Sequence, residues 1–124
     1  SMVETIALNG TTDVLGLKAF YSISRVAVSA ALAGNLTVGT TSKLGLPYRP
    51  VVGGFLRGRA NEDTADAGTY VAPIRTTSTA TTADVRGTYA PAGTLNGTNV
   101  FTVDIAVANG PTNAAGFGIA QFTA

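Results

Sequence analysis

Few residues of this chain could do acid–base or metal chemistry, because its 124 residues include no His and no Cys. Imidazole is the usual general base near neutral pH, and thiolate is the usual soft metal ligand. A catalytic centre would need a carboxylate pair such as Glu62 and Asp84, or a serine beside a lysine. The lysines available are Lys18 and Lys43. No spacing marks either arrangement, so we predict a structural or binding protein, not an enzyme, and expect no cofactor.

One short segment offers oxygen ligands of the kind that Ca²⁺ prefers. Its candidate ligands are Asn61, Glu62, Asp63 and Asp66. The segment lacks the Asp-x-Asp-x-Asp-Gly spacing of an EF-hand loop, and a lone motif of this kind has a high false-positive rate. Residues 59–66 are more typical of a solvated loop, which keeps a weakly charged protein soluble. We therefore predict an exposed loop here and no metal site.

Arginine accounts for six of the eight basic residues. Arginine is enriched and lysine depleted at protein interfaces, and the planar guanidinium group is well shaped for carboxylates and phosphates. The residues predicted to contact a partner are Arg49, Arg57, Arg59, Arg86, Phe117 and Phe122. The two phenylalanines are equally typical of a hydrophobic core, and that alternative stays open.

The charge of the chain argues against two classes of partner. Only 12% of the residues are charged and the net charge is +1, so no strong field favours nucleic acid or an anionic membrane surface. No stretch approaches the roughly 18 apolar residues that can span a bilayer. The first residues lack the basic and apolar regions of a signal peptide, and Ser1-Met2 is interpreted as a cloning scar. We expect neither nucleic acid nor a membrane among the partners.

The elements that must position these residues are expected to be short β-strands. Thr, Val, Tyr and Phe favour sheets, and here they occur in short runs separated by Gly, Asn and Pro. The clearest run covers residues 100–107. Alternation places on one of its faces Phe101, Val103, Ile105 and Val107. We predict that this face belongs to the core.

A second run, residues 19–29, changes parity near its middle. The large side chains of its first half lie on one face, whereas those of its second half lie on the other. A β-bulge near Ser24-Arg25 would reconcile the two halves, so we predict a bulged strand. A helix over residues 17–32 is the alternative, because the alanines near the end of that range favour helix.

Further strands are predicted at residues 3–8, 36–39, 51–57, 69–75, 84–89 and 117–123. Asn-Gly pairs favour tight reversals, so we expect turns in at least two of three places. These pairs are at residues 9–10, 96–97 and 109–110. Pro73 lacks a backbone donor, which places the strand that contains it at a sheet edge or in an extended arm.

Residues 76–83 contain only Thr, Ser and Ala, and we predict an exposed loop there. Together, these patterns predict an all-β fold over residues 1–124 as a single domain. About eight short strands of this kind are typical of an antiparallel β-sandwich or barrel.

Several stretches resemble small virion structural proteins of tailed double-stranded DNA bacteriophages, in particular head decoration proteins, which stabilise the capsid. In the first part of the chain these stretches are ETIALNG at 4–10, KAFYSI at 18–23, GNLTVGT at 34–40 and LGLP at 44–47. In the second part they are ADVRGTYAP at 83–91 and LNGT at 95–98. Together they extend over most of the chain.

The resemblance implies a non-enzymatic protein on the outer capsid surface of a virion, with no catalytic residues and no cofactor. It implies a homo-oligomer, with a trimer favoured, and a major capsid protein or another virion protein as partner. In such proteins an additional strand commonly precedes the segment that here begins at Val3, so a missing N-terminal strand is expected. Segments 44–50 and 117–124 are the expected contacts with a neighbouring subunit or the shell.

Two other functions stay open at this point. A tail, neck or fibre-attachment component of a virion would have a similar composition. A bacterial surface adhesin or glycan-binding β-sandwich would need exposed aromatic side chains for stacking on sugars. The chain has no Trp, and its four tyrosines do not cluster in the sequence, although the fold could bring them together.

Overall fold

The strands of this protein lie in the second part of the chain. The structure, a computed structural model, describes residues 2–61 and 63–108. Within them the regular elements are six β-strands and no helix. The strands are β1 (Leu44–Gly45), β2 (Pro50–Ala60), β3 (Thr64–Ala65), β4 (Thr69–Val71), β5 (Thr88–Ala90) and β6 (Phe101–Val107). The prediction of an all-β fold is confirmed for this part of the chain.

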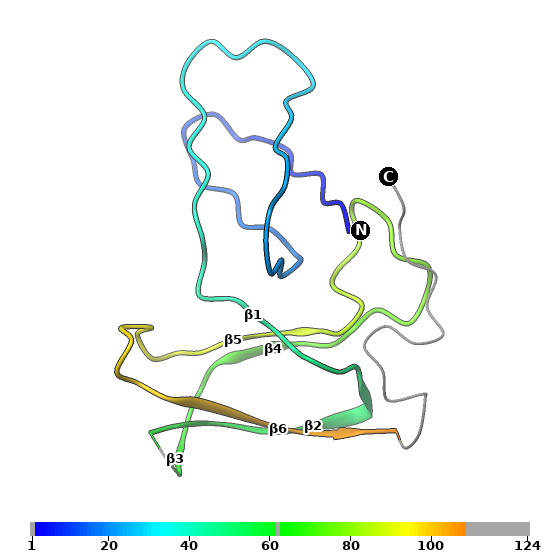
Figure 1. Cartoon of the computed structure of the whole chain (residues 1–124), viewed down its shortest axis with the longest axis vertical. Helices are drawn as coiled ribbons and strands as arrows, with labels where there is room; N and C mark the ends of the chain where they lie inside the picture. Colours follow the sequence, from blue (N-terminus) through cyan, green and yellow to red (C-terminus); the bar gives the residue numbers. More distant parts are fainter. Residues whose placement is uncertain (1, 62, 109–124) are drawn as a thin grey trace.

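The strands form two antiparallel sheets of three strands each, with the orders β3-β2-β6 and β1-β5-β4 (Figure 1). In the first sheet, Arg57 lies across from Asp104 and Arg59 lies across from Thr102. In the second sheet, Tyr89 of β5 has Leu44 of β1 on one side and Tyr70 of β4 on the other.

Strand β2 is bent where it is rich in glycine. Its pairing with β6 shifts register between Pro50 and Phe55, and again between Phe55 and Arg57. Gly53 has a φ of +70°, a left-handed conformation that a side chain would disfavour. A β-bulge is therefore present in the molecule, but on β2 and not near residues 24–25.

Aromatic side chains from the two sheets meet at one point. Tyr89 is fully buried. The ring of Phe55 stacks on Tyr70 with the centroids 4.3 Å apart and lies 5.7 Å from Tyr89. Gly58 of β2 lies directly against the Tyr89 hydroxyl, and a Cβ atom at residue 58 would overlap it. The absence of a side chain at Gly58 is thus what lets the two sheets approach.

The first part of the chain, residues 2–43, forms no strand, and we call it the N-terminal lobe. It runs as irregular loops in the upper half of Figure 1, with an isolated bridge between Asn9 and Thr12. The strands predicted at 3–8, 19–29 and 36–39 are therefore wrong, as is the helix alternative for 17–32. A strand needs a partner strand, and within the described residues none pairs with this segment.

Predictions in the second part of the chain agree better with the structure. The strand predicted at 51–57 lies within β2, and the run at 100–107 is β6. The strands predicted at 69–75 and 84–89 are reduced to β4 and β5. Strand β4 ends before Pro73 and lies at a sheet edge, as expected.

Some details of these elements differ from the expectation. The structure has two strands of only two residues, β1 and β3, that the sequence did not indicate. The predicted core face of β6 is half-buried along with the rest of that strand. The predicted strand 117–123 lies outside the described residues. The described chain therefore has six strands where about eight were expected for the whole.

Two of the expected Asn-Gly turns are confirmed. Gly10 and Gly97 both have positive φ, and the Asn96 side chain accepts bonds from the two amides that follow Gly97. The third pair, at 109–110, lies outside the described residues. The expected loop at 59–66 is wrong in part, since it contains the end of β2 and all of β3. The loop at 76–83 is irregular, yet it contains the buried Ser78.

Candidate interaction surface

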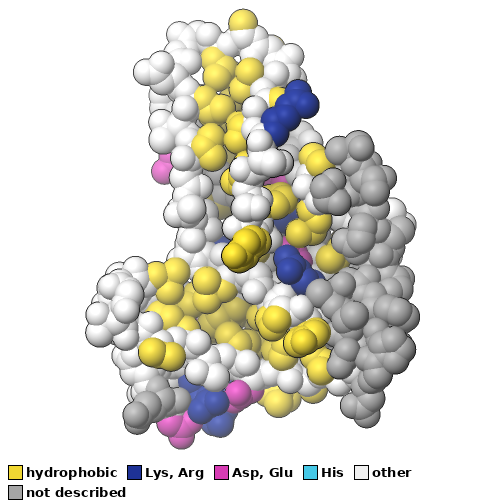
Figure 2. Space-filling view, in the orientation of Figure 1, with side chains coloured by type: hydrophobic (Ala, Val, Ile, Leu, Met, Phe, Trp, Pro, Cys, Tyr) yellow, Lys and Arg dark blue, Asp and Glu magenta, His cyan; other side chains and the backbone are white. Residues whose placement is uncertain are grey.

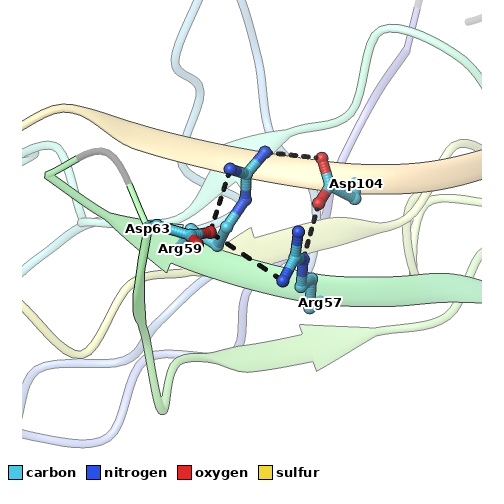
Figure 3. A network of polar contacts seen from close by, with 4 residues as sticks. All are labelled: Arg57, Arg59, Asp63 and Asp104. Atoms are coloured by element: carbon cyan, nitrogen blue, oxygen red, sulfur yellow. Dashed lines mark hydrogen bonds and ion pairs between the residues drawn. The ribbon is translucent and has the colours of Figure 1, made fainter.

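Arg57 and Arg59 lie side by side on the side of β2 that faces away from Tyr89, because residues on either side of Gly58 point opposite to it. With Asp63 and Asp104 they form the arginine–aspartate cluster (Figure 3). Arg57 Nε lies 2.9 Å from Asp104 Oδ2, and Arg59 Nη2 lies 3.1 Å from Asp104 Oδ1. Asp63 Oδ1 lies 3.3 Å from Arg59 Nη1 and 3.9 Å from Arg57 Nη1.

The cluster balances its own charge. Hydrogen bonds from Arg57 and Arg59 lower the pKa of Asp104, and the bond to Asp104 raises the pKa of Arg59. Two guanidinium groups facing two carboxylates carry no excess charge with which to attract an anion. Together with Asp63 and Asp104, these two arginines therefore form a neutral polar patch.

The other predicted contact residues lie elsewhere. Arg86 lies beside the buried carboxylate of Asp84, with Arg86 Nε 3.5 Å from Asp84 Oδ1, and Arg86 Nη2 donates to the Ala19 carbonyl at 3.3 Å. Arg49 is half-buried immediately before β2. Phe117 and Phe122 lie outside the described residues. The fold thus brings together Arg57 and Arg59 but separates Arg86 from them.

A small hollow of about 270 Å³ opens beside Arg86. It is lined by Ala19, Phe20, Tyr21, Lys43, Leu44, Gly45 and Arg86. Two cations face this hollow, but the Arg86 guanidinium already contacts Asp84, and Lys43 Nζ donates to the Gly16 carbonyl. The hollow lies at the junction between the N-terminal lobe and the sheet that contains β1.

Polar contacts hold the base of the N-terminal lobe to the loop that precedes β5. Lys18 is buried, and its Nζ donates to the carbonyls of Thr79, at 2.8 Å, and Thr82. The Thr5 amide donates to the Ala80 carbonyl at 2.8 Å. The sequence offered Lys18 and Lys43 as partners of a nucleophilic serine, but both ammonium groups are bonded to backbone carbonyls. These contacts fix the lobe at its base.

Above these contacts the lobe exposes an apolar surface. Thirteen large hydrophobic side chains of the lobe are exposed. They are Ile6, Leu8, Val14, Leu15, Leu17, Phe20, Tyr21, Ile23, Val26, Val28, Leu32, Leu36 and Val38. Figure 2 shows apolar side chains gathered over the lobe, with few charged ones among them. The lobe also encloses an open hollow of about 2040 Å³ lined by residues of the range 2–43. Exposed apolar surface on this scale is typical of a protein–protein contact.

The described candidate calcium ligands make separate contacts and do not converge on one point. Asn61, which has a φ of +45°, donates to the Asn99 side chain at 3.2 Å and accepts from the Val100 amide at 3.1 Å. Asp63 belongs to the arginine–aspartate cluster, and Glu62 lies outside the described residues. Within residues 2–61 and 63–108, no three acidic, His or Cys side chains come close enough to hold a metal ion.

Asp66, the last of those candidates, holds the buried tyrosine instead. Tyr89 Oη donates to Asp66 Oδ2 at 2.5 Å, and the Ala92 amide donates to the same oxygen at 3.2 Å. Burial, followed by the Asp66 carboxylate, raises the pKa of Tyr89 to about 12. The bond from Tyr89 lowers the pKa of Asp66. The pair therefore stays as a neutral phenol and a carboxylate at neutral pH, a structural contact between β5 and the loop after β3.

Sequence reasoning missed the apolar surface of the lobe, because it assigned the same side chains to strands with a buried face. It also missed Asp104 as the counter-ion of two predicted contact arginines. An acid on the polar face of residues 100–107 is visible in the sequence, but only the register of β2 against β6 places it across from Arg57. No sequence pattern indicated the pair of Tyr89 and Asp66, since 23 residues separate them.

Comparisons with known proteins gave no match, since no family model fits the chain and neither a curated protein nor a solved structure is similar to it. Among the described residues, no helix is long and apolar enough to cross a membrane.

Proposed function

We propose that this protein is a non-enzymatic structural component of a phage virion, a head decoration protein that binds and stabilises the capsid shell as a homo-oligomer. Its partners in this proposal are further copies of the chain, with a trimer favoured, and the major capsid protein. The virion, at its outer surface, is the place where it acts. The local resemblance to phage virion proteins supports the class of protein, and the surface of the lobe supports the mode of action.

The observation that carries the proposal is the exposed apolar surface of the N-terminal lobe. A free monomer rarely exposes so many large aliphatic and aromatic side chains on one segment, because contiguous apolar surface drives association. A subunit of a large assembly, in contrast, needs such surface for its contacts with neighbours. Because the contacts repeat over many copies, weak single contacts can give strong attachment.

The sheets have the properties that a scaffold for such contacts needs. In this proposal they form a small two-layer sandwich that packs around Tyr89 and presents the lobe on one side. The arginine–aspartate cluster on the outside of β2 and β6 is neutral and exposed at Arg57 and Asp63, so it suits a polar rim of a contact. Neither feature requires a cofactor or a reacting group.

The proposal is tested by sedimentation with empty capsid shells that lack this protein, prepared from the phage that encodes it. We expect saturable binding of the purified chain at a copy number set by repeated positions on the shell, and a higher melting temperature of the loaded shell. A control with shells that already carry the protein should bind none.

Three results would contradict the decoration role. Failure of the chain to sediment with shells at any concentration would remove the shell as partner. A few copies confined to one vertex of mature particles, determined by quantitative mass spectrometry and electron microscopy, would favour a neck or tail component. Binding to a glycan array without binding to shells would favour the surface adhesin.

A further inference from the structure

Residues 19–29, which we call the arm, combine a strand-like sequence with a backbone that has no ladder. From residue 20 to residue 42 every residue is exposed, so neither face of the arm is covered. No backbone amide or carbonyl of residues 20–29 is hydrogen-bonded to another described residue. Among the described residues, the polar contacts of the arm backbone are at its start, where the Ala19 amide donates to the Asp84 carboxylate at 3.2 Å and the Ala19 carbonyl accepts from Arg86.

Within the described part of the chain, one long strand has a free edge. Strand β6 lies at the end of the order β3-β2-β6, and among the described residues only β2 pairs with it. With seven residues it is longer than the other edge strands β1, β3 and β4. A long edge with unpaired amides and carbonyls readily accepts a further strand.

The exposed area is too large for a compact single chain. The chain exposes 8408 Å², whereas a compact protein of 12.5 kDa exposes about 6,200 Å². The excess is about 2,200 Å² for each chain. Stable subunit interfaces bury roughly 2,000–5,000 Å² over both partners, so association of copies could cover an excess of this size.

We propose that the arm of each chain pairs as an antiparallel β-strand with the free edge of β6 in a second copy of this chain. This pairing rests on the homo-oligomer of the proposed function and names the elements that build it. It satisfies the unbonded backbone of the arm and covers the edge of β6 in one step. Because donor and acceptor elements differ, the contact is head-to-tail and can close into a ring, such as a trimer.

Charge favours one register of this pairing. Arg25 is the only charged residue of the arm, and Asp104 is the only charged residue of β6. Placing Arg25 across from Asp104 pairs residues 22–28 with the whole of 101–107. The Asp104 carboxylate accepts one bond from each of two arginines and has capacity for more. Opposite charges directly across a pair of strands stabilise it, whereas like charges destabilise it.

Disulfide trapping tests this register cleanly, because the chain has no cysteine of its own. In the proposed pairing residue 27 of one copy lies across from residue 102 of the other. Ala27→Cys and Thr102→Cys are therefore made as separate variants of the full chain, mixed and oxidised. Directly opposed residues have Cβ atoms about 4.5–5.5 Å apart, close enough for a disulfide after a small adjustment. We expect a covalent dimer of the two variants on a non-reducing gel.

The matched control replaces Thr102→Cys with Thr94→Cys, an exposed position outside both elements. This mixture should give at least tenfold less of the mixed dimer. Each single variant oxidised alone should also give little dimer, because in the proposed register residue 27 of one copy does not lie across from residue 27 of the other, nor residue 102 across from residue 102. Equal cross-linking of the 27/102 and 27/94 mixtures would overturn the register.

A second experiment tests whether the arm builds the oligomer. Ile23→Pro removes a backbone amide in the middle of the arm and should reduce the mass by light scattering to that of one chain, 12.5 kDa. The sheets should stay folded, since Ile23 is 60% exposed and bonded to no other described residue. Leu95→Pro, at an aliphatic position outside the arm that is 44% exposed, should keep the oligomer.

The outcomes separate this pairing from the decoration role. An oligomer that persists in Ile23→Pro and gives no 27/102 cross-link overturns the pairing and leaves shell binding to be judged by sedimentation. A wild-type chain that stays monomeric at every concentration and does not cross-link overturns the pairing as well. A cross-linked oligomer that does not bind shells supports the pairing and removes the decoration role.

Discussion

The N-terminal lobe and the sheet region, residues 44–107, are built from similar residues and yet differ in structure. Both are rich in Val and Thr, but every strand of the described chain lies in the sheet region. In the sheet region each strand has a partner, and aromatic rings from both sheets cover one another. In the lobe the same residue types are exposed. The comparison teaches that strand propensity becomes structure only where a partner strand and a covering side chain exist.

The two regions also differ in what holds them. The sheet region is fixed by the buried Tyr89 and the rings around it, whereas the lobe is fixed by polar contacts at its base around Lys18. Apolar burial increases with the area covered, so the sheet region contributes most of the stability of the single chain. In the proposed oligomer, the apolar side chains of the lobe are buried by association. Variants made in pairs, one in each region, measure this difference directly.

The largest effect is expected from Tyr89→Ala. This change empties the space between the sheets and should lower the free energy of unfolding by about 3–5 kcal/mol. Its partner variant, Tyr21→Ala, removes the most exposed tyrosine and should change that free energy by less than about 0.5 kcal/mol. Urea unfolding of the Ile23→Pro background, where each chain is expected to be monomeric, gives both values. Similar losses at the two positions would mean that the regions are equally packed.

A glycine pair sharpens the same comparison. Gly58→Ala places a methyl group against the Tyr89 hydroxyl and should destabilise the fold by about 1–3 kcal/mol. Gly34→Ala in the lobe meets no atom within 4 Å, so its effect should stay within about 0.5 kcal/mol. The midpoints of thermal unfolding, followed by near-ultraviolet circular dichroism, report the difference. An unchanged thermal midpoint for Gly58→Ala would show that Tyr89 of β5 does not pack against Gly58 of β2.

Alkaline pH should act on the sheet region through Tyr89. Its pKa is raised from 10 to about 12 in the folded state, so its contribution to stability is complete below pH 10 and is lost as the pH rises towards 12. The free energy of unfolding should fall over that window. Tyr89→Phe should remove most of this dependence, leaving a smaller part from Tyr70, whose pKa burial also raises. A wild-type profile that matches Tyr89→Phe would contradict the buried phenol.

Acid should act through the carboxylate of the same pair. The pKa of Asp66 is lowered from its usual 3.8, so its contribution is complete above that pH and is lost as the pH falls through the folded-state value. Tyr89→Phe removes the bond responsible and should flatten this acid limb as well. The same urea titrations, extended below pH 4, measure it.

The sequence predicted the sheet region better than the lobe, for a physical reason. Strand β6 was recognisable because seven residues alternate without interruption. The two-residue strands β1 and β3 are defined by their partners and not by their own residues, so no local pattern indicates them. The lobe was predicted as strands because propensity is local, whereas the absence of a partner strand among the described residues depends on the whole fold.

The candidate interaction surface was also predicted only in part. Composition indicated an interface rich in arginine, and the fold places Arg57 and Arg59 together on β2. The sequence could not show that Asp104 neutralises them, because that contact depends on the register of two strands that are far apart in the chain. Nor could it show that the apolar residues of the lobe are exposed, since alternation predicts one buried face without saying what buries it.

The smallest effect is expected from the arginine–aspartate cluster. Asp104→Asn removes the carboxylate that Arg57 and Arg59 share, but the pairs are partly exposed, so the thermal midpoint should fall by a few degrees at most. The loss should shrink in high salt, which screens surface charges, and also as the pH falls through the lowered pKa of Asp104, because the wild-type carboxylate is then protonated. Asp13→Asn in the lobe, an exposed acid bonded to no other described residue, should leave the midpoint unchanged under all these conditions. A fall for Asp104→Asn that persists in high salt would show that the cluster acts by packing rather than by charge, and would weaken its assignment as a polar rim.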